Sequence, residues 1–235
     1  MNKTGLYPVR KASRKGLFLI IRKGIKKQGY KNSKRKGYDM GNQQREKEDC
    51  SIFINLPSWV FEVLDFAAPG CTDEDKMRLT IRLACENVLQ GTGGPFGAAI
   101  FHQPGNRLVA VGVNSVERLQ NAILHAEVMA IMLAEARLKS YSLRAKGSSY
   151  HELITSCEPC AMCLGAALWS GARRIVCGAG REDASGLGFE EGPVFPESYR
   201  YLEARGIEIV HGVLADEARA VFDLYRQQQG LIYNA

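Results

Sequence analysis

Two short motifs, thirty-two residues apart, place the tightest limits on how this chain can fold. The first is "HAE" at residues 125–127, and the second is "PCAMC" at residues 159–163. Each stands at the start of an apolar run with helical spacing, so each predicts the first turn of a helix. Within a helix, the side chains of His125 and Glu127 would point in opposite directions, because only residues three or four apart share a face. At a first turn the two side chains can face the same site, since a cap residue has non-helical dihedral angles and can turn its side chain the other way.

Both motifs carry side chains that bind transition metals. Cys160 and Cys163 are three residues apart, and this helical spacing places both thiols on one face. A helix N-terminus lowers the pKa of a cysteine, so thiols there ionise readily. The C-x-x-C spacing alone is ambiguous, because it is also typical of redox-active sites. Together with His125 from the other helix start, the two thiols make a set of three protein ligands.

Three protein ligands are typical of catalytic zinc, whereas structural zinc sites use four. Zinc lowers the pKa of a bound water from about 15.7 to about 7, which generates hydroxide at neutral pH. Glu127 lies beside the ligands and can accept and return a proton, a role worth about 10² to 10⁴ in rate. We therefore expect a Zn²⁺ site with Glu127 as the catalytic acid and base. The competing interpretation is a zinc-stabilised binding module, which needs a fourth protein ligand that the sequence does not clearly supply.

From residue 51 onward, helical and strand patterns follow one another. Helices are expected at 58–67, 72–90, 126–139, 159–171 and 215–229, and strands at 96–101, 107–114, 152–157, 174–179 and 206–214. Thr72 and Asp75 have capping-box spacing, and Pro159 is expected at the first position of its helix. Residues 102–106 are typical of a hairpin turn, and residues 180–200 of loops. The order predicts an α/β protein: a three-layer α/β/α sandwich with a mixed five-stranded sheet.

The positive net charge of the chain belongs to its first fifth. Residues 1–49 hold fifteen Lys or Arg and four Asp or Glu, whereas residues 50–235 hold sixteen and twenty-one. The first segment has too few apolar residues to offset the entropy of ordering, so we expect a disordered tail. A nucleic-acid arm and a start codon placed too early, with Met40 as the true start, are alternatives. Residues 50–235 are expected to form the catalytic domain.

Composition also bears on the compartment. Hydrophobic residues make up 46% and charged residues 24% of the chain, as in ordinary globular proteins. No apolar run approaches the roughly 18 residues of a membrane span, and no cleavage site follows the short apolar run at 16–21, so we expect neither a span nor a signal peptide. Seven cysteines, an odd number, argue against a fully paired disulfide framework and for the cytoplasm.

Residues 72–235 resemble the cytidine deaminase superfamily, and most closely its bacterial guanine deaminases. His-x-Glu followed by Pro-Cys-x-x-Cys is the signature of zinc-dependent nucleobase deaminases. The resemblance is also carried by "GGPFGAAI" at 93–100 and "TSCEPCAMCLGAALW" at 155–169. It implies hydrolytic deamination of guanine to xanthine and ammonia, with tRNA adenosine deamination as the alternative.

Three other stretches bear on the choice between these two relatives. tRNA adenosine deaminases share "GVLADEA" at 212–218 but usually have a leucine at position 157, where this chain has Cys157. The paired acids of "GFEE" at 188–191 favour guanine deaminase. Both relatives usually have Asp-Pro-Thr-Ala before the histidine, whereas this chain has "NAIL" at 121–124. That departure leaves the breadth of purine substrates open.

The resemblance also implies roles for residues outside the metal site. Asn114 would hydrogen-bond the purine, and backbone N–H groups near Ala98 and Ala126 would orient it. Phe96 and Trp169 would pack on the flat ring, although both side chains are equally compatible with the hydrophobic core.

Two further residues are implied at the mouth of the site. Glu191 would accept hydrogen bonds from guanine N–H groups and shuttle protons. Tyr233 would belong to a C-terminal segment that closes the pocket, in some relatives across a dimer. The expected partners are a small-molecule purine and a second copy of the chain; nucleic acid is expected only under the tRNA alternative.

Overall fold

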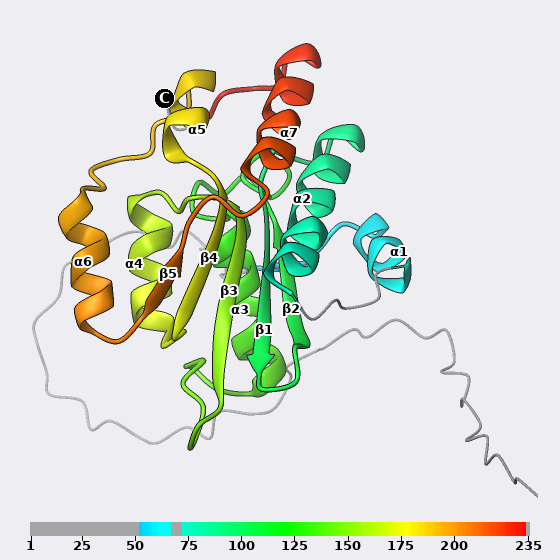
Figure 1. Ribbon diagram of the computed structural model, residues 1–235. Coiled ribbons are helices and arrows are strands. Elements are labelled where there is room, and N and C mark those ends of the chain that lie inside the picture. Colours follow the sequence, from blue (N-terminus) through cyan, green and yellow to red (C-terminus); the bar gives the residue numbers. More distant parts are fainter. Residues whose placement is uncertain (1–51, 67–71, 234–235) are drawn as a thin grey trace, which may run out of the picture. The chain divides into compact units, whose positions relative to one another are not determined.

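The computed structural model describes residues 52–66 and 72–233. The tail predicted at residues 1–49 lies outside the described residues. The described part contains a five-stranded sheet with strand order β2-β1-β3-β4-β5 (Figure 1). β1 pairs antiparallel with both β2 and β3, whereas β3, β4 and β5 run parallel. The strands are β1 (Gly97–Gln103), β2 (Arg107–Val113), β3 (Tyr150–Cys157), β4 (Arg174–Ala179) and β5 (Glu208–Val210).

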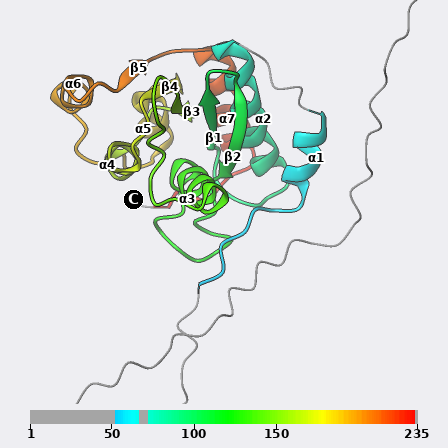
Figure 2. The same ribbon diagram turned by 90° about the horizontal axis from the view of Figure 1, so that it is seen from below.

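Helices cover both faces of this sheet. In Figures 1 and 2, α2 and α7 lie on one face, with α1 beside α2, and α3 and α4 lie on the other. The predicted three-layer α/β/α sandwich with a mixed sheet is therefore confirmed. The helices are α1 (Trp59–Phe66), α2 (Asp73–Leu89), α3 (Ala126–Leu138), α4 (Ala161–Ser170), α5 (Arg181–Leu187), α6 (Pro196–Ala204) and α7 (Ala215–Gln227). None of the described helices is long and apolar enough to cross a membrane.

Alternating side chains of β1 build the two hydrophobic cores. Ala99 and Phe101 belong to the core under α2 and α7, whereas Ala98 and Ile100 belong to the core under α3 and α4. This alternation is the period of two that a strand imposes, and both faces of the strand are apolar because both are covered. The predicted capping box is present at the start of α2, where the Asp75 N–H donates to the Thr72 hydroxyl.

A glycine in β2 determines how closely α3 approaches the sheet. A methyl group at Gly112 would collide with the Ala126 carbonyl oxygen and the Ala130 nitrogen. Because glycine lacks that group, the first turn of α3 lies directly against the strand. This contact places the histidine motif at the edge of the sheet where β3 and β4 end, the edge at which α/β folds usually bind ligands.

The structure differs from the sequence prediction in three places. The segment 180–200, predicted as loop, contains α5 and the start of α6. The strand predicted at 206–214 is reduced to Glu208–Val210, because Gly212 and Leu214 adopt left-handed conformations. Pro159 does not open its helix: Cys160 is the N-cap of α4, and its ψ of 172° keeps it extended.

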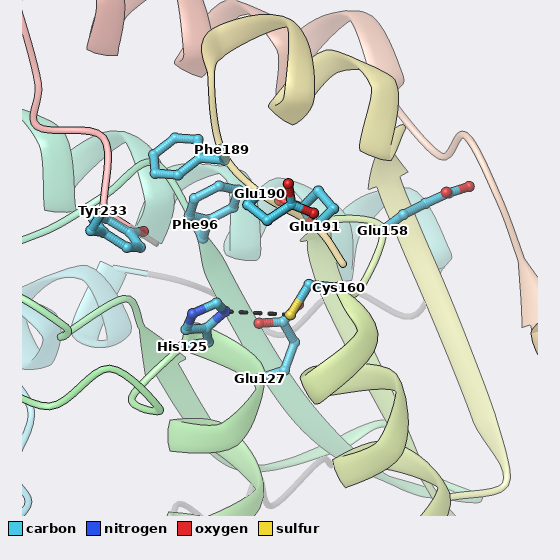
Figure 3. Close-up of a pocket in the computed structure, with 9 residues that line it drawn as sticks. All are labelled: Phe96, His125, Glu127, Glu158, Cys160, Phe189, Glu190, Glu191 and Tyr233. Atoms are coloured by element: carbon cyan, nitrogen blue, oxygen red, sulfur yellow. Dashed lines mark hydrogen bonds between the residues drawn. The ribbon is translucent and has the colours of Figure 1, made fainter. Parts of the chain in front are cut away.

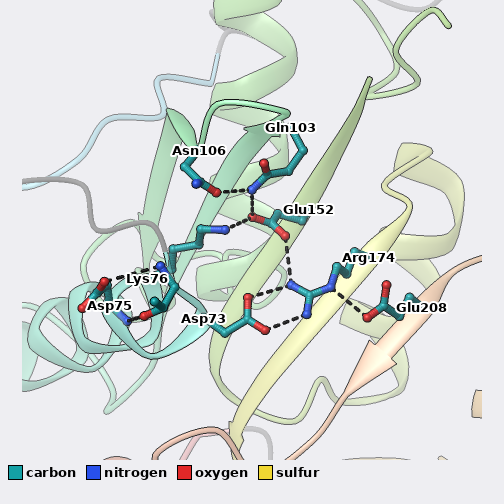
Figure 4. A network of polar contacts seen from close by, with 9 residues as sticks. Asp73, Asp75, Lys76, Gln103, Asn106, Glu152, Arg174 and Glu208 are labelled. Carbon is teal, nitrogen blue, oxygen red and sulfur yellow. Dashed lines mark hydrogen bonds and ion pairs between the residues drawn. The ribbon is translucent and has the colours of Figure 1, made fainter. Parts of the chain in front are cut away.

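A buried ion-pair network ties the opposite end of the sheet to α2 (Figure 4). The Glu152 carboxylate, 1% exposed, lies 2.6 Å from Lys76 Nζ and 3.1 Å from Arg174 Nη1. Arg174 also binds Asp73 at 2.6 Å, and this pair lowers the pKa of the Asp73 carboxyl. Glu152 and Arg174 are neighbours in the register of β3 and β4, so the network joins two strands and the first turn of α2.

Removing the Glu152 carboxylate should make the domain less stable, because the Lys76 ammonium would remain buried without its partner. We expect Glu152→Ala to lower the free energy of unfolding by about 3–5 kcal/mol, as for other broken buried pairs. Urea denaturation followed by circular dichroism measures this change. Glu208→Ala is the matched control, since Glu208 binds the same arginine from a position that is 64% exposed. Equal losses in the two variants would contradict a structural role for the buried network.

Candidate active site and metal centre

The first turns of α3 and α4 bring the two sequence motifs together. His125 is the N-cap of α3 and Cys160 the N-cap of α4, both in extended conformation and neither capping its own helix with its side chain. His125 Nδ1 and Cys160 Sγ are 3.6 Å apart (Figure 3). The ligand atoms of His125, Cys160 and Cys163 all lie within 4.8 Å of one another.

These separations fit a zinc ion. Tetrahedral coordination with bonds of about 2.0–2.3 Å holds neighbouring ligand atoms about 3.6 Å apart. Cys157, which stands three residues before Cys160, does not join this set: its sulfur donates to the Gly180 carbonyl at 3.5 Å, away from the ligands. Among the described residues, the site therefore offers one imidazole and two thiols as ligands, as the sequence predicts.

The two thiols and the imidazole form a coupled set. The pKa of Cys160 is lowered to about 4, because the Cys163 thiol and the His125 ring both stabilise its thiolate. The pKa of Cys163 is raised well above its ordinary value, since its proton is held between Cys160 and Glu127. Burial alone would lower the pKa of His125, but its bond to Cys160 and the Glu127 charge raise it. Zinc binding releases the thiol proton, because the metal ligand is the thiolate.

Glu127 is buried beside the ligands. Its carboxyl is 6% exposed and accepts hydrogen bonds from the Thr155 hydroxyl at 3.2 Å and the Cys163 thiol at 3.5 Å. Burial raises the pKa of this carboxyl, and the nearby Cys160 charge raises it further. A carboxyl in such a place can hold a proton at neutral pH and give it up when a positive charge is nearby. This is the property that the predicted acid–base role requires.

The pocket above these groups combines acids with aromatic rings (Figure 3). Its cavity measures about 20 Å³, room for about one water molecule. A purine is far larger, so a lining side chain must move when a ring enters. The lining residues are Phe96, His125, Glu127, Glu158, Cys160, Phe189, Glu190, Glu191 and Tyr233.

Three residues predicted from the resemblance lie in this pocket: Phe96, Glu191 and Tyr233. Burial raises the pKa of Glu191 to about 8, with further contributions from the charges of Cys160 and Glu127. The Glu191 carbonyl also accepts from the Ala161 N–H at 2.9 Å, which attaches its loop to the start of α4. The Tyr233 ring lies 4.9 Å from the ring of Phe189, and its buried hydroxyl has no hydrogen-bond partner among the described residues.

Asn114 follows the end of β2 and is fully buried. Its Oδ1 accepts from the backbone N–H groups of Gly94 at 3.4 Å and Val116 at 3.3 Å. Its Nδ2, also buried, has no partner among residues 52–66 and 72–233. A buried donor left unpaired is costly, so this amide is a candidate for binding a ligand.

Ala98 and Ala126 are both completely buried. Ala98 lies inside β1, in register with Gly112 and Thr155, and Ala126 opens α3. Both positions border the site, and the use of their N–H groups to orient a substrate stays a prediction.

Trp169 does not pack in the pocket, contrary to the prediction. Its side chain is 81% exposed on the last turn of α4 and is not among the pocket-lining residues. Six residues at about 100° each place it about 120° around the helix from Cys163, so it points away from the metal ligands. Phe189 lines the pocket instead, beside Phe96.

The sequence interpretation assigned no role to Phe189, Glu158 and Thr155, and it included Glu190 only as one of the paired acids of "GFEE". Phe189 belongs to the same stretch. Glu158 stands between the cysteine motif and the strand before it, and it pairs with Arg181 at 3.3 Å and His211 at 2.6 Å. The signal was present in each case: these residues lie within the motifs or next to them.

Comparison with known proteins agrees with this geometry. Residues 71–179 match the family model of the cytidine and deoxycytidylate deaminase zinc-binding region. Guanine deaminase from Bacillus subtilis is 36% identical over 143 residues, which cover 61% of this chain and 87% of the relative. This chain belongs to the cytidine and deoxycytidylate deaminase family. The three ligands and Glu127 all lie within the matched residues, and a zinc-dependent hydrolytic deaminase is the enzyme class that the match and the site support together.

Solved structures of deaminases match more of the chain. A guanine deaminase from Nitrosomonas europaea is 37% identical with a TM-score of 0.71, covering 75% of this chain and 97% of its own. A structure determined in complex with 8-azaguanine is 36% identical with a TM-score of 0.72, covering 77% of this chain and 98% of its own. Both matches cover a larger share of this chain than the family model does.

Zinc content is the direct test of the ligand set. We expect the purified deaminase to carry about one zinc ion per chain, as a site of this composition should. Cys163→Ser should reduce this content at least about tenfold, since losses of that size follow even from changes to groups that support a ligand. Inductively coupled plasma mass spectrometry measures the metal. Cys85→Ser, a partly buried thiol on α2, is the control, and a loss of zinc as large in the control would contradict the assignment.

Proposed function

We propose that this protein is a guanine deaminase that hydrolyses guanine to xanthine and ammonia. The observation that carries the proposal is the three-ligand zinc set with buried Glu127 beside it, opening on a pocket that holds Glu191. The relatives with the TM-scores above 0.7 are described as guanine deaminases or contain a guanine analogue, which supports the same substrate.

The chemistry divides between the metal and the protein. When bound, zinc supplies a water molecule acidic enough to react at neutral pH. Glu127 would accept one proton of the attacking water and give it to a ring nitrogen of the purine. It would then take the second proton from the oxygen that has added to C2 and give it to the amine, which leaves as ammonia. The Thr155 hydroxyl holds Oε1 of Glu127 at 3.2 Å, whereas Oε2 accepts from the Cys163 thiol at 3.5 Å. Zinc binding would remove that thiol proton and free Oε2 to face the reacting atoms.

Guanine recognition is assigned to Asn114 and Glu191. Guanine carries adjacent donors, the ring N1–H and the exocyclic amine, and a carboxylate is the acceptor that matches both. Glu191 is the pocket acid placed for this role, and the unpaired Asn114 amide donates to a ring acceptor. Phe96, Phe189 and Tyr233 cover the faces of the ring.

We also propose that the enzyme is a homodimer formed through α3 and α4. These two helices lie side by side in Figure 2. They and the loop after α3 expose large apolar side chains: Trp169 at 81%, Met132 at 37%, Met162 at 36% and Tyr141 at 94%. Exposed apolar side chains of this size are typical of interfaces, and tryptophan is enriched at their centres.

The cytoplasm is the compartment we propose. All five cysteines of the described residues are free thiols, and two of them are metal ligands that a disulfide would remove. Such thiols persist in a reducing compartment. Recovery of the active enzyme from a secreted or periplasmic fraction after cell fractionation would contradict this assignment.

Replacing the two acids should separate their roles. Glu127→Gln should keep zinc and fold but reduce the guanine turnover number at least about 10², because it removes the acid–base group. Glu191→Gln should raise the KM for guanine while leaving zinc content unchanged. Ammonia release from guanine, adenine and cytosine, with circular dichroism for folding, measures both. Turnover close to wild type in Glu127→Gln would eliminate the proposed mechanism.

A charged side chain introduced into the proposed interface tests whether the enzyme is a dimer. Trp169→Glu should convert the dimer to a monomer at micromolar concentration, because it buries an unpaired carboxylate. Light scattering coupled to gel filtration measures the mass. Phe61→Glu, at an equally large side chain exposed on α1, is the control and should remain dimeric. A monomeric wild-type enzyme would overturn the assignment.

A further inference from the structure

Residues 52–66 precede the segment 71–179 that the family model matches, and their helix α1 lies beside α2. Val60 and Val63 of α1 are buried in the same core as α2. Two polar side chains of this segment, Asn55 and Trp59, do something different. Trp59 donates a hydrogen bond to the loop before β1, and Asn55 accepts one from the loop after β2. Both loops frame the pocket, so the segment is connected to the site as well as to the core.

The first link begins at the Trp59 indole. Its Nε1–H donates to the Thr92 hydroxyl at 3.1 Å, and the Thr92 hydroxyl donates to Asn87 Oδ1 at 2.7 Å. The indole can only donate, so it occupies the acceptor side of the hydroxyl. With that side occupied, the Thr92 proton is directed at Asn87. The indole therefore sets the direction of the next hydrogen bond.

Asn87 carries the link to the substrate-binding residues. Its side chain is completely buried, and its Nδ2 donates to the carbonyls of Gly94 and Asn114, both at 2.9 Å. These two bonds need the amide nitrogen on one side and the oxygen on the other. Thr92 supports that orientation, because its hydroxyl donates to Asn87 Oδ1 at 2.7 Å, the shorter of its two contacts with Asn87; the Asn87 carbonyl lies 3.4 Å away. Asn87 thereby fixes the distance between the "GGPF" loop and the end of β2.

The distance between the "GGPF" loop and the end of β2 determines how Asn114 is held. The Asn114 backbone is held by Asn87, and its side-chain Oδ1 is held by the Gly94 N–H and the Val116 N–H. Only its Nδ2 is unpaired among the described residues. A methyl group at Gly93 would collide with the Asn114 carbonyl and with Asn87 Nδ2, so the packing here leaves no room for adjustment.

A second link from the same segment reaches the next residue along the chain. Arg118 donates to the Asn55 side chain at 3.0 Å, to the Asn55 carbonyl, and to the Ser115 hydroxyl at 3.1 Å. Ser115 directly follows Asn114. Segment 52–66 is therefore linked to Asn114 by two routes, through Thr92 and Asn87 and through Arg118 and Ser115.

We propose that Trp59 is a positioning residue for the Asn114 amide, acting through Thr92 and Asn87. This inference rests on the proposed role of Asn114 in binding the purine. The segment before the family-matched residues thus contributes to substrate affinity without touching the substrate. A merely structural role for Trp59 would lower stability and leave affinity for the purine unchanged.

Trp59→Phe tests this directly in the full-length zinc enzyme, since phenylalanine keeps a packing ring and lacks the N–H donor. We expect the KM for guanine to rise about 2- to 10-fold, the effect of one lost hydrogen bond, with zinc content unchanged and kcat within about twofold. Phe61→Leu, on the same helix and 60% exposed, is the matched control and should keep the wild-type KM. A wild-type KM in Trp59→Phe would overturn the proposal.

The route through Asn114 is tested by a double-mutant cycle. Trp59→Phe should reduce kcat/KM in the wild-type background and have no further effect in an Asn114→Ala background. An equal reduction in both backgrounds would show that Trp59 acts elsewhere and would overturn the proposal.

Hydrogen exchange separates this proposal from the assignment of guanine as substrate. Mass spectrometry should show faster amide exchange in Trp59→Phe at residues 92–96 and 113–116, with no change there in Phe61→Leu. This readout needs no turnover. Absence of guanine turnover in the wild-type enzyme would reject the proposed substrate alone, whereas unchanged exchange in Trp59→Phe would reject the positioning role alone.

Discussion

The close approach of two helix N-termini is the constraint on which the rest of this structure depends. His125 and Cys160 are both cap residues, and a cap residue can direct its side chain away from its own helix. Gly112 allows α3 to contact the sheet, and the loop of Glu191 holds the start of α4 through the Ala161 N–H. The side chains of the two cap residues consequently face each other across 3.6 Å. Glu127 and Cys163 lie in the first turns of the same two helices.

Burial gives these groups their chemical properties. Burial raises the pKa of the Glu127 carboxyl, and the neighbouring thiolate charge raises it further. Cys160 is the opposite case, since two donors lower the pKa of its thiol to about 4. One compact region thus holds a thiolate ready to bind metal and a carboxyl ready to transfer protons. The pocket above it is lined by Glu191 and by aromatic rings, a combination that matches a flat molecule with N–H donors.

Much of this arrangement could be predicted from the sequence, because spacing determines it. Because an apolar run with helical spacing follows them, a histidine and a glutamate two apart predict a helix start, and the cysteine spacing selects the other ligands. The strand and helix patterns also gave the correct layers. Trp169 shows where this reasoning fails: residue type suggested an aromatic wall, but the helical angle from Cys163 directs the side chain outward. The helices within 180–200 and the contacts of Asn87 depend on tertiary packing, for which single residues carry little signal.

Zinc K-edge X-ray absorption of the purified protein tests the central claim most directly. The account predicts four ligands close to the metal: two sulfur atoms, one imidazole nitrogen and one oxygen from solvent. A third sulfur atom, which Cys157 would have to supply, or four ligands all from protein would describe a closed structural site. Either result would contradict the catalytic centre described above.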